Sequence, residues 1–246
     1  MADHQDITAV LADWPYQPGV VSARLVAAAD GRDVIQLRVE LGLLQMETEH
    51  RPDGQQPGGA PTYLDLMDQA ALAEGEKFEL SDEQAEELDR EFIQYYHRRI
   101  CWLALREFDR AVGDADHTLR LMDFAAAHSG DEEWVVSHEQ YRPFVLFHRT
   151  QAAALFRLTE EGPEEAVEEI NAGLERIREV YSRFEAEEEF SEDELAEQLR
   201  RLQEWIRENY SVGRTLREQL ADAVASEQYE LAAQLRDELS RRPKGQ

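Results

Sequence analysis

The stretch His50–Pro61, HRPDGQQPGGAP, divides the chain into two regions that must fold differently. It holds three prolines and three glycines in twelve residues. Proline fixes φ and removes a backbone donor, while glycine raises the entropy cost of order, so neither a helix nor a strand is expected to pass through this stretch. We therefore expect a structural boundary near residue 61.

The region before this boundary is patterned as a small antiparallel sheet. Residues 20–28 and 33–41 are rich in β-branched side chains and flank Ala29–Arg32, whose Asp-Gly pair is typical of a tight turn. The second segment alternates apolar and polar residues as a half-buried strand does: Ile35, Leu37, Val39 and Leu41 are apolar, and Gln36, Arg38 and Glu40 are polar. A third strand over residues 43–48, after Gly42, is expected.

The region after the boundary carries helix start and stop signals. Thr62 with Asp65 has the pattern of an N-cap pair, Gly75 that of a stop, and Ser81–Gln84 that of a capping box. A second capping box is predicted at Ser191–Glu194, opening a helix. One face of that helix is apolar, at Leu195, Leu199, Leu202 and Ile206.

Two stretches of the middle region share a spacing of small and apolar residues. Ala111, Val112, Ala115 and Leu119 have the same mutual offsets as Ala166, Val167, Ile170 and Leu174, and each set follows a helix with large apolar side chains. This pattern resembles tetratricopeptide-like helical hairpins, in which small residues let antiparallel helices approach. The two sets lie 55 positions apart rather than about 34, which argues against a regular array, and residues 131–143 would be the insertion. An ordinary antiparallel bundle remains the alternative.

The segment from Leu216 to Leu239 is patterned as two short helices back to back. Leu216, Leu220 and Ala223 recur at helical spacing before Ser226–Gln228, which suits a tight reversal. Beyond the reversal Leu231, Leu235 and Leu239 recur at the same spacing. The pair Ala232 and Ala233 permits close approach near the turn, and Arg236 is expected to reach carboxylates on either helix.

The order of residues in this segment resembles the UVR motif, the hairpin of UvrB and UvrC of bacterial excision repair, which also occurs in some quality-control adaptors and Clp-type chaperones. The resemblance implies a docking module that binds a second copy or the matching hairpin of another UVR-containing protein. A hairpin this short buries little surface, so its apolar stripe is expected to need a partner. The alternative is a helix pair packed on its own domain. The predicted protein-binding residues are Leu216, Leu220, Ala223, Tyr229, Glu230, Ala232, Ala233, Leu235, Arg236, Asp237 and Leu239.

Charge and cysteine content narrow the choice of partners and compartment. The net charge of -27 opposes binding to nucleic acid or anionic lipid, whereas the segment from Ser211 onward has six acids and six bases. This change of character supports a separate C-terminal module. Cys101 is the single cysteine, so no internal disulfide or multi-cysteine zinc site is expected, and it is predicted to be buried. Without a leader pattern or a long apolar run, a cytoplasmic protein that contacts neither membrane nor DNA is expected.

Motifs that would specify a reaction are lacking. The sequence has no G-x-x-x-x-G-K-[ST], G-x-G-x-x-G or G-x-S-x-G pattern. His128, His138 and His148 lie ten apart, which is no helix-face spacing, and Asp114 with His117 is a pair that chance supplies often. No catalytic, cofactor-binding or metal-binding residue is therefore predicted. The competing class is an enzyme or small-ligand binder with a pocket between the sheet and the helices.

These patterns together predict a mainly α protein of five parts. They are a flexible N-terminus (1–16), a small antiparallel β element with its Pro/Gly loop (17–61), a tetratricopeptide-like helical domain (62–190), a connecting helix (191–210) and a UVR helical hairpin (211–243). The predicted function is a non-enzymatic adaptor linked to nucleotide excision repair or protein quality control.

Overall fold

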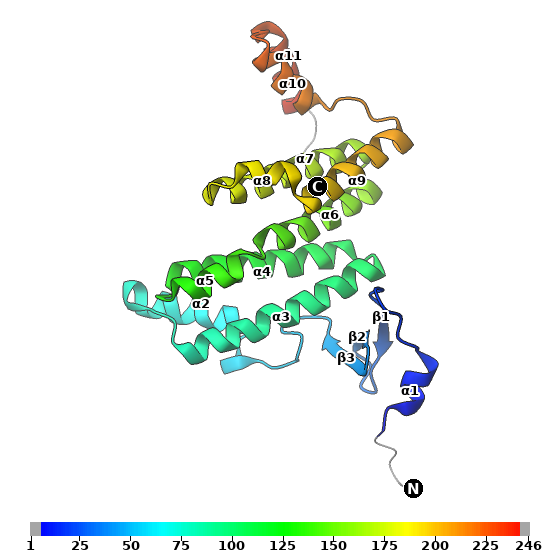
Figure 1. Cartoon of the computed structure of the whole chain (residues 1–246), viewed down its shortest axis with the longest axis vertical. Coiled ribbons are helices and arrows are strands. Elements are labelled where there is room, and N and C mark those ends of the chain that lie inside the picture. The colour runs from blue at the N-terminus through cyan, green and yellow to red at the C-terminus, as the bar shows by residue number, and fades with distance from the viewer. Residues whose placement is uncertain (1–5, 242–246) are drawn as a thin grey trace. The chain divides into compact units, whose positions relative to one another are not determined.

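A computed structural model describes residues 6–241, so residues 1–5 of the expected flexible N-terminus and residues 242–243 of the expected hairpin lie outside the description (Figure 1). The chain forms two compact units, which divide between Val145 and Leu146. We call them the N-terminal unit and the C-terminal unit. Helix α6 (Arg142–Glu160) crosses the division.

The N-terminal unit combines a three-stranded sheet with helices. Its elements are α1 (Thr8–Asp13), β1 (Ala23–Ala27), β2 (Asp33–Val39), β3 (Gly42–Glu47), the 3-10 turns η1 (Pro57–Gly59) and η2 (Gly75–Lys77), α2 (Tyr63–Glu74), α3 (Asp82–Leu105), α4 (Phe108–His128) and α5 (Glu132–Glu139). The C-terminal unit is helical. Beyond α6 it contains α7 (Pro163–Arg183), α8 (Glu187–Glu192), α9 (Glu194–Tyr210), α10 (Leu216–Ala225) and α11 (Tyr229–Arg241).

The sheet is antiparallel in the order β1-β2-β3, as the sequence predicts. Ile35 pairs with Leu25 on one side and with Met46 on the other, and both Ile35 and Leu37 are buried. The sheet packs against α3. There Arg98 of α3 donates to the carbonyl oxygens of Glu47 and His50 at 3.1 and 2.8 Å. These bonds attach the chain that leaves β3 to the helix.

Two residues of β2 and its turn depart from the predicted alternation. Leu41 was expected on the apolar face, but it lies in the turn before β3 and is 90% exposed. Arg38 was expected on a solvated face, but it is buried. Its guanidinium donates to the carbonyl oxygens of Trp14 and Gly42 at 2.7 and 2.8 Å. The segment around Trp14 therefore covers the polar face of the strand at this position.

The helix ends of the N-terminal unit follow the local signals. Thr62 accepts from the backbone N–H of Asp65 at 3.1 Å and caps α2, which ends at Gly75 with φ 64°. Ser81 and Gln84 form both hydrogen bonds of the predicted capping box of α3. The prediction of a second box at Ser191 was wrong. Asp193 caps α9 instead, accepting from Ala196 N at 2.7 Å, because Ser191 belongs to α8 and donates to Glu188 O.

Helices α3 and α4 form an antiparallel pair that holds the core of the N-terminal unit (Figure 1). One buried cluster joins α2, α3 and α4: its members are Leu64, Met67, Phe78, Leu88, Leu121 and Phe124. Ala111 and Ala115 are fully buried, as expected for the small positions of the shared spacing. Cys101 is buried on α3, as predicted.

The C-terminal unit places α7 against α9. Ala166, Val167 and Ile170 of the second spacing set are fully buried, and Pro163 lies in the first turn of α7. A β-carbon built on Gly173 would lie 2.1 Å from Cγ2 of Thr150, so α6 and α7 approach closely there. The fold is mainly helical with a small N-terminal sheet and a C-terminal helical pair. The resemblance to tetratricopeptide hairpins stays a prediction.

Candidate protein-docking hairpin

Helix α10 begins at a capping box that the sequence analysis missed. Thr215 accepts from Glu218 N at 3.2 Å, and Glu218 accepts from Thr215 N at 2.8 Å. These two bonds satisfy N–H groups that the first turn of a helix leaves free. The sequence carries the capping-box pattern Thr-x-x-Glu at Thr215–Glu218, and this pattern fixes the start of the hairpin.

The reversal between α10 and α11 lies at Ser226–Gln228, as predicted. Glu227 takes a left-handed conformation with φ 57°. Gln228 N donates to Ala223 O at 2.7 Å, and Ala232 N donates to Gln228 O at 2.9 Å. Ala223 and Ala232 are both buried, so small side chains let the helices approach next to the turn.

The apolar faces of the two helices pack on each other. The buried members of this hairpin core are Leu216, Ala223, Ala232 and Leu235, with the half-buried Leu220 and Leu239 packed against them. Among the described residues, every member of this core belongs to the hairpin itself. The stripe expected to need a partner is therefore covered by the facing helix, rather than by the upstream helices.

Three apolar side chains near the turn of the hairpin are exposed. Val224, Tyr229 and Leu231 are 53%, 69% and 42% exposed. We call these three residues the turn patch. Tyr229 and Leu231 also line a shallow groove of about 540 Å³ with Glu230 and Gln234. Helical spacing in the sequence does not single out Val224, because this residue lies outside the stripe formed by Leu216, Leu220 and Ala223.

The structure sorts the eleven predicted binding residues into two groups. The hairpin core takes six of them: Leu216, Leu220, Ala223, Ala232, Leu235 and Leu239. The exposed group has five: Tyr229, Glu230, Ala233, Arg236 and Asp237. Leu231 was expected to share a stripe with Leu235, but Ala232 takes the inward position and Leu231 is exposed. Arg236 forms an ion pair with Asp237 of its own helix at 2.9 Å.

Polar contacts tie the start of the hairpin to the preceding helices of the C-terminal unit. Glu218 accepts from Asn171 of α7 at 3.0 Å and pairs with Arg207 of α9. Arg217 lies 3.4 Å from Glu168. Partial burial alone would raise the pKa of Glu218, but hydrogen bonds from Thr215 and Asn171 and the charge of Arg207 bring it below its usual value. The first turn of α10 is anchored, whereas the turn patch lies at the far end of that helix.

Asp114 and His117, the pair treated as chance in the sequence, belong to a buried polar network in the N-terminal unit. Arg98 donates to both carboxylate oxygens of Asp114 at 2.7 and 2.9 Å. His117 Nε2 lies 2.8 Å from Glu91, whose carboxylate also accepts from Tyr63 N at 2.6 Å and from Leu64 N at 3.2 Å. Glu91 thus holds the N-terminus of α2. Because these contacts hold helices and a loop together, the network is structural.

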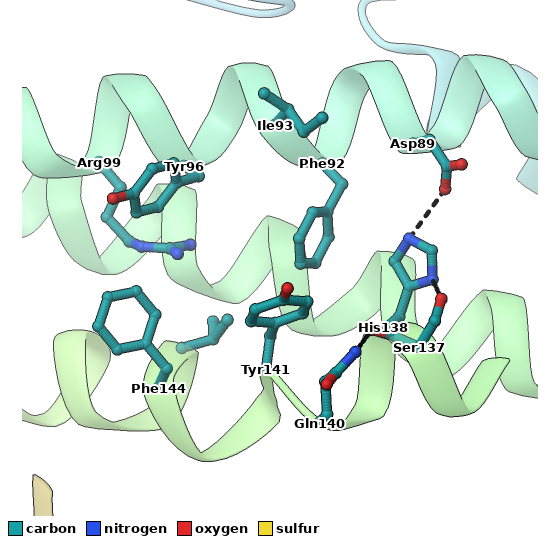
Figure 2. Close-up of a pocket in the computed structure, with 11 residues that line it drawn as sticks. Asp89, Phe92, Ile93, Tyr96, Arg99, Ser137, His138, Gln140, Tyr141 and Phe144 are labelled. Carbon is teal, nitrogen blue, oxygen red and sulfur yellow. Dashed lines mark hydrogen bonds and ion pairs between the residues drawn. The ribbon is translucent and has the colours of Figure 1, made fainter. Parts of the chain in front are cut away.

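A serine, a histidine and an aspartate also meet beside α5, in the order a hydrolase would use (Figure 2). Ser137 Oγ lies 3.3 Å from His138 Nδ1, and His138 Nε2 lies 2.8 Å from Asp89 Oδ1. However, Ser137 Oγ donates to the carbonyl oxygen of Trp134 at 2.6 Å, and His138 Nδ1 lies 2.9 Å from the same oxygen. The serine proton is therefore directed at the backbone, so this is no nucleophile–base pair.

Within residues 6–241, no group of three or more His, Cys, Asp or Glu side chains is placed to hold a metal ion. Over the same residues, no helix has both the length and the apolar character needed to cross a membrane.

The hairpin is a capped two-helix module with its own core and exposed apolar side chains near its turn. Residues 214–241 match the family model described as the UvrB/uvrC motif. The chain therefore carries this motif, which is known from nucleotide excision repair proteins. The match covers the hairpin alone. No curated protein and no solved structure matches the chain.

Proposed function

We propose that this protein is a non-enzymatic adaptor that docks another protein through the hairpin at residues 211–243. The observation that carries the proposal is the match to the UvrB/uvrC motif over a hairpin with its own core. The helix at 191–210 serves as its connection to the body of the chain. The tetratricopeptide-like helices at 62–190 would supply a second interaction surface, so that the adaptor brings two proteins together.

The turn patch is the part of the hairpin that we assign to the partner. Apolar side chains exposed together on a small module commonly mark an interaction site. Tyrosine contributes strongly at such sites because it buries a large ring and keeps a polar tip. The exposed polar residues Glu230, Arg236 and Asp237 would surround the patch and select the partner by charge. The six core residues act indirectly, because they keep α10 and α11 together.

The partner that best fits this surface is a matching hairpin. It belongs either to another UVR-containing protein or to a second copy of this chain. We assign the adaptor to nucleotide excision repair or to protein quality control in the bacterial cytoplasm, the settings in which the resembling hairpins occur. Direct DNA binding is disfavoured by the net charge of -27.

Leu231→Asp in the full chain tests the assignment, because the substitution places a charge in the turn patch without entering the hairpin core. Leu235→Asp would be a poorer test, since Leu235 is buried and its loss would unfold the hairpin. The matched control is Leu72→Asp on α2, where the leucine is 87% exposed. Circular dichroism then checks that both variants stay folded.

Sedimentation velocity over a range of concentrations measures self-association, and affinity capture followed by peptide identification shows whether a UVR-containing protein is retained. We expect Leu231→Asp to remove whichever association occurs and Leu72→Asp to leave it unchanged. Equal association by both variants would remove the turn patch from the binding site. Salt-sensitive retention on DNA by the wild-type chain would contradict the proposal of a protein-only adaptor.

A further inference from the structure

An apolar groove lies in the N-terminal unit between α3 and the α5–α6 segment (Figure 2). Its volume is about 730 Å³. Ile93 and Tyr141 are 53% and 50% exposed, so part of this apolar surface faces solvent. The location differs from the expected pocket between the sheet and the helices. The apolar walls are formed by Phe92, Ile93, Tyr96, Tyr141, Phe144 and Val145.

A second hollow, of about 860 Å³, meets the apolar groove at Asp89, which lines both. Asp89 Oδ1 accepts from Trp134 Nε1 at 3.0 Å and lies 2.8 Å from His138 Nε2. Trp134 lines the second hollow and His138 lines the groove, so the two hollows follow each other along α3 and α5. Asp82 at one end and Tyr96 at the other are about 21 Å apart along α3.

The second hollow is acidic, and we call it the acidic hollow. No lysine, arginine or histidine is among the described residues that line it. Six exposed carboxylates line it besides Asp89, and they are Glu79, Asp82, Glu86, Asp131, Glu132 and Glu133. Carboxylates gathered on one side of a hollow attract cations and repel anions. An occupant that extends from the groove into this hollow is therefore expected to be basic there.

Charge also limits which occupants fit the combined surface. Nucleic acid and anionic lipid would be repelled by the acidic hollow. The body of a second copy is disfavoured in the same way, because the net charge of the chain is -27. Arg99 lines the far end of the groove, but it is buried and donates to Thr118 within the unit at 2.9 Å. The surface offered to a partner thus has an apolar half and an acidic half.

We propose that this surface docks a segment of a partner protein that has basic residues at one end and large apolar residues at the other. The apolar side chains lie between the aromatic walls, where their burial supplies affinity. The lysines and arginines lie over the acidic hollow, where charge complementarity fixes the direction of the segment and speeds its association. A helix of about 14 residues spans the two hollows.

This inference rests on the proposed function for the idea that residues 62–190 carry a second interaction surface, and it gives that surface a class of partner. The residues that line the two hollows all belong to the N-terminal unit, and none belongs to the hairpin. Binding at this surface can therefore be measured separately from docking by the hairpin.

Fluorescence anisotropy of the full chain with three labelled synthetic peptides of about 14 residues tests the site. The probe has lysine and arginine in its first half and leucine and phenylalanine in its second half. One altered peptide has glutamine in place of each basic residue, and the other has serine in place of each apolar residue. We expect the probe to bind at one site per chain and each altered peptide to bind at least about tenfold more weakly.

Each result that departs from this pattern counts against the proposal. No binding by the probe would overturn it. Equal binding by the glutamine peptide would show that the acidic hollow does not select the occupant. Equal binding by the serine peptide would show that the probe is attracted only by the overall negative charge and that the groove has no part in binding.

Variants at exposed positions locate the binding with little risk to the fold. Ile93→Ser in the groove and Glu86→Lys in the acidic hollow should each weaken binding of the probe about tenfold. The matched controls Leu72→Ser on α2 and Glu208→Lys on α9 make the same changes at exposed positions outside both hollows, and they should keep the wild-type affinity. Wild-type affinity in either groove or hollow variant, or an equal loss in its control, would refute the assignment.

Leu231→Asp in the hairpin separates this inference from the proposed function. It should leave binding of the probe unchanged, because Leu231 lies in the hairpin and lines neither hollow. Loss of hairpin docking with the probe still bound would count against the hairpin proposal alone. Loss of probe binding in Leu231→Asp would place the binding at the hairpin and overturn the inference drawn for the groove.

Discussion

Gly173→Ala is the substitution whose cost follows most directly from the packing of the C-terminal unit. A β-carbon at this position would meet Thr150 Cγ2 at 2.1 Å, Oγ1 at 2.2 Å and Cβ at 2.6 Å. Ordinary contacts of such atoms lie at about 3.5 to 4 Å, so α6 and α7 must separate by more than an ångström. Overpacking of this kind costs about 1–3 kcal/mol. We expect the unfolding free energy of the C-terminal unit to fall by at least that amount.

Gly113→Ala in α4 is the matched control, because a β-carbon there would meet no heavy atom of the described chain within 4 Å beyond the adjacent backbone of its own helix. Alanine is favoured over glycine inside a helix by about 1 kcal/mol, so this variant should be more stable than the wild type. Glycine-to-alanine substitution is therefore predicted to stabilise the protein at position 113 and to destabilise it at position 173. Urea unfolding followed by circular dichroism and tryptophan fluorescence measures the unfolding free energy of both variants.

Thr150→Ala should partly rescue Gly173→Ala, since it removes two of the three clashing atoms and leaves Cβ. The Thr150 hydroxyl is buried and has no hydrogen-bond partner among residues 6–241, so its loss alone should cost little. A double-mutant cycle should then show that Gly173→Ala costs less stability in the Thr150→Ala background than in the wild type. If Gly173→Ala is as stable as Gly113→Ala, or if Thr150→Ala does not rescue it, the close approach of α6 and α7 is refuted.

Three further outcomes follow from buried or anchored side chains. Glu91→Gln should destabilise the N-terminal unit by about 3 kcal/mol in urea unfolding, because the carboxylate binds His117 and two backbone N–H groups. The control Glu86→Gln, at an exposed position, should have little effect. Cys101 should resist iodoacetamide at about pH 8 until urea is added, as judged by mass spectrometry, because burial raises the pKa of its thiol to about 12. Glu218 has a lowered pKa in the fold. Its stabilising effect is therefore present above the unfolded pKa of about 4 and is lost as pH falls through the folded value. Melting curves should show this loss of stability in the wild type and no such loss in Glu218→Gln.

The parts of the fold that the sequence predicts correctly are those set by neighbouring residues. The caps at Thr62 and Ser81, the stop at Gly75 and the reversal at Ser226–Gln228 each depend on a few consecutive side chains. The capping box predicted at Ser191 failed for a related reason. Asp193 directly precedes α9 and caps it through Ala196 N, whereas Ser191 lies within α8.

The parts that could not be predicted depend on contacts between distant residues. Arg38 lies on a polar strand face, and only the position of the Trp14 carbonyl shows that it is covered. Glu91 and His117 are 26 positions apart, so their contact depends on how α3 packs on α4. The candidate site shows the same division. The hairpin follows from local spacing, but which of its residues face outward depends on the packing of α11 on α10, which places Ala232 inward and Leu231 outward.

Photo-crosslinking from position 229 tests the docking account most directly. Tyr229, at 69% exposure, is replaced by benzoylphenylalanine in the full chain, and the crosslinked peptides are identified by mass spectrometry. The account predicts an adduct with a helical hairpin of another polypeptide, either a second copy or a UVR-containing protein, that disappears when Leu231→Asp is added. An adduct confined to α7 or α9 of the same chain would show that the patch is covered internally and would contradict the account.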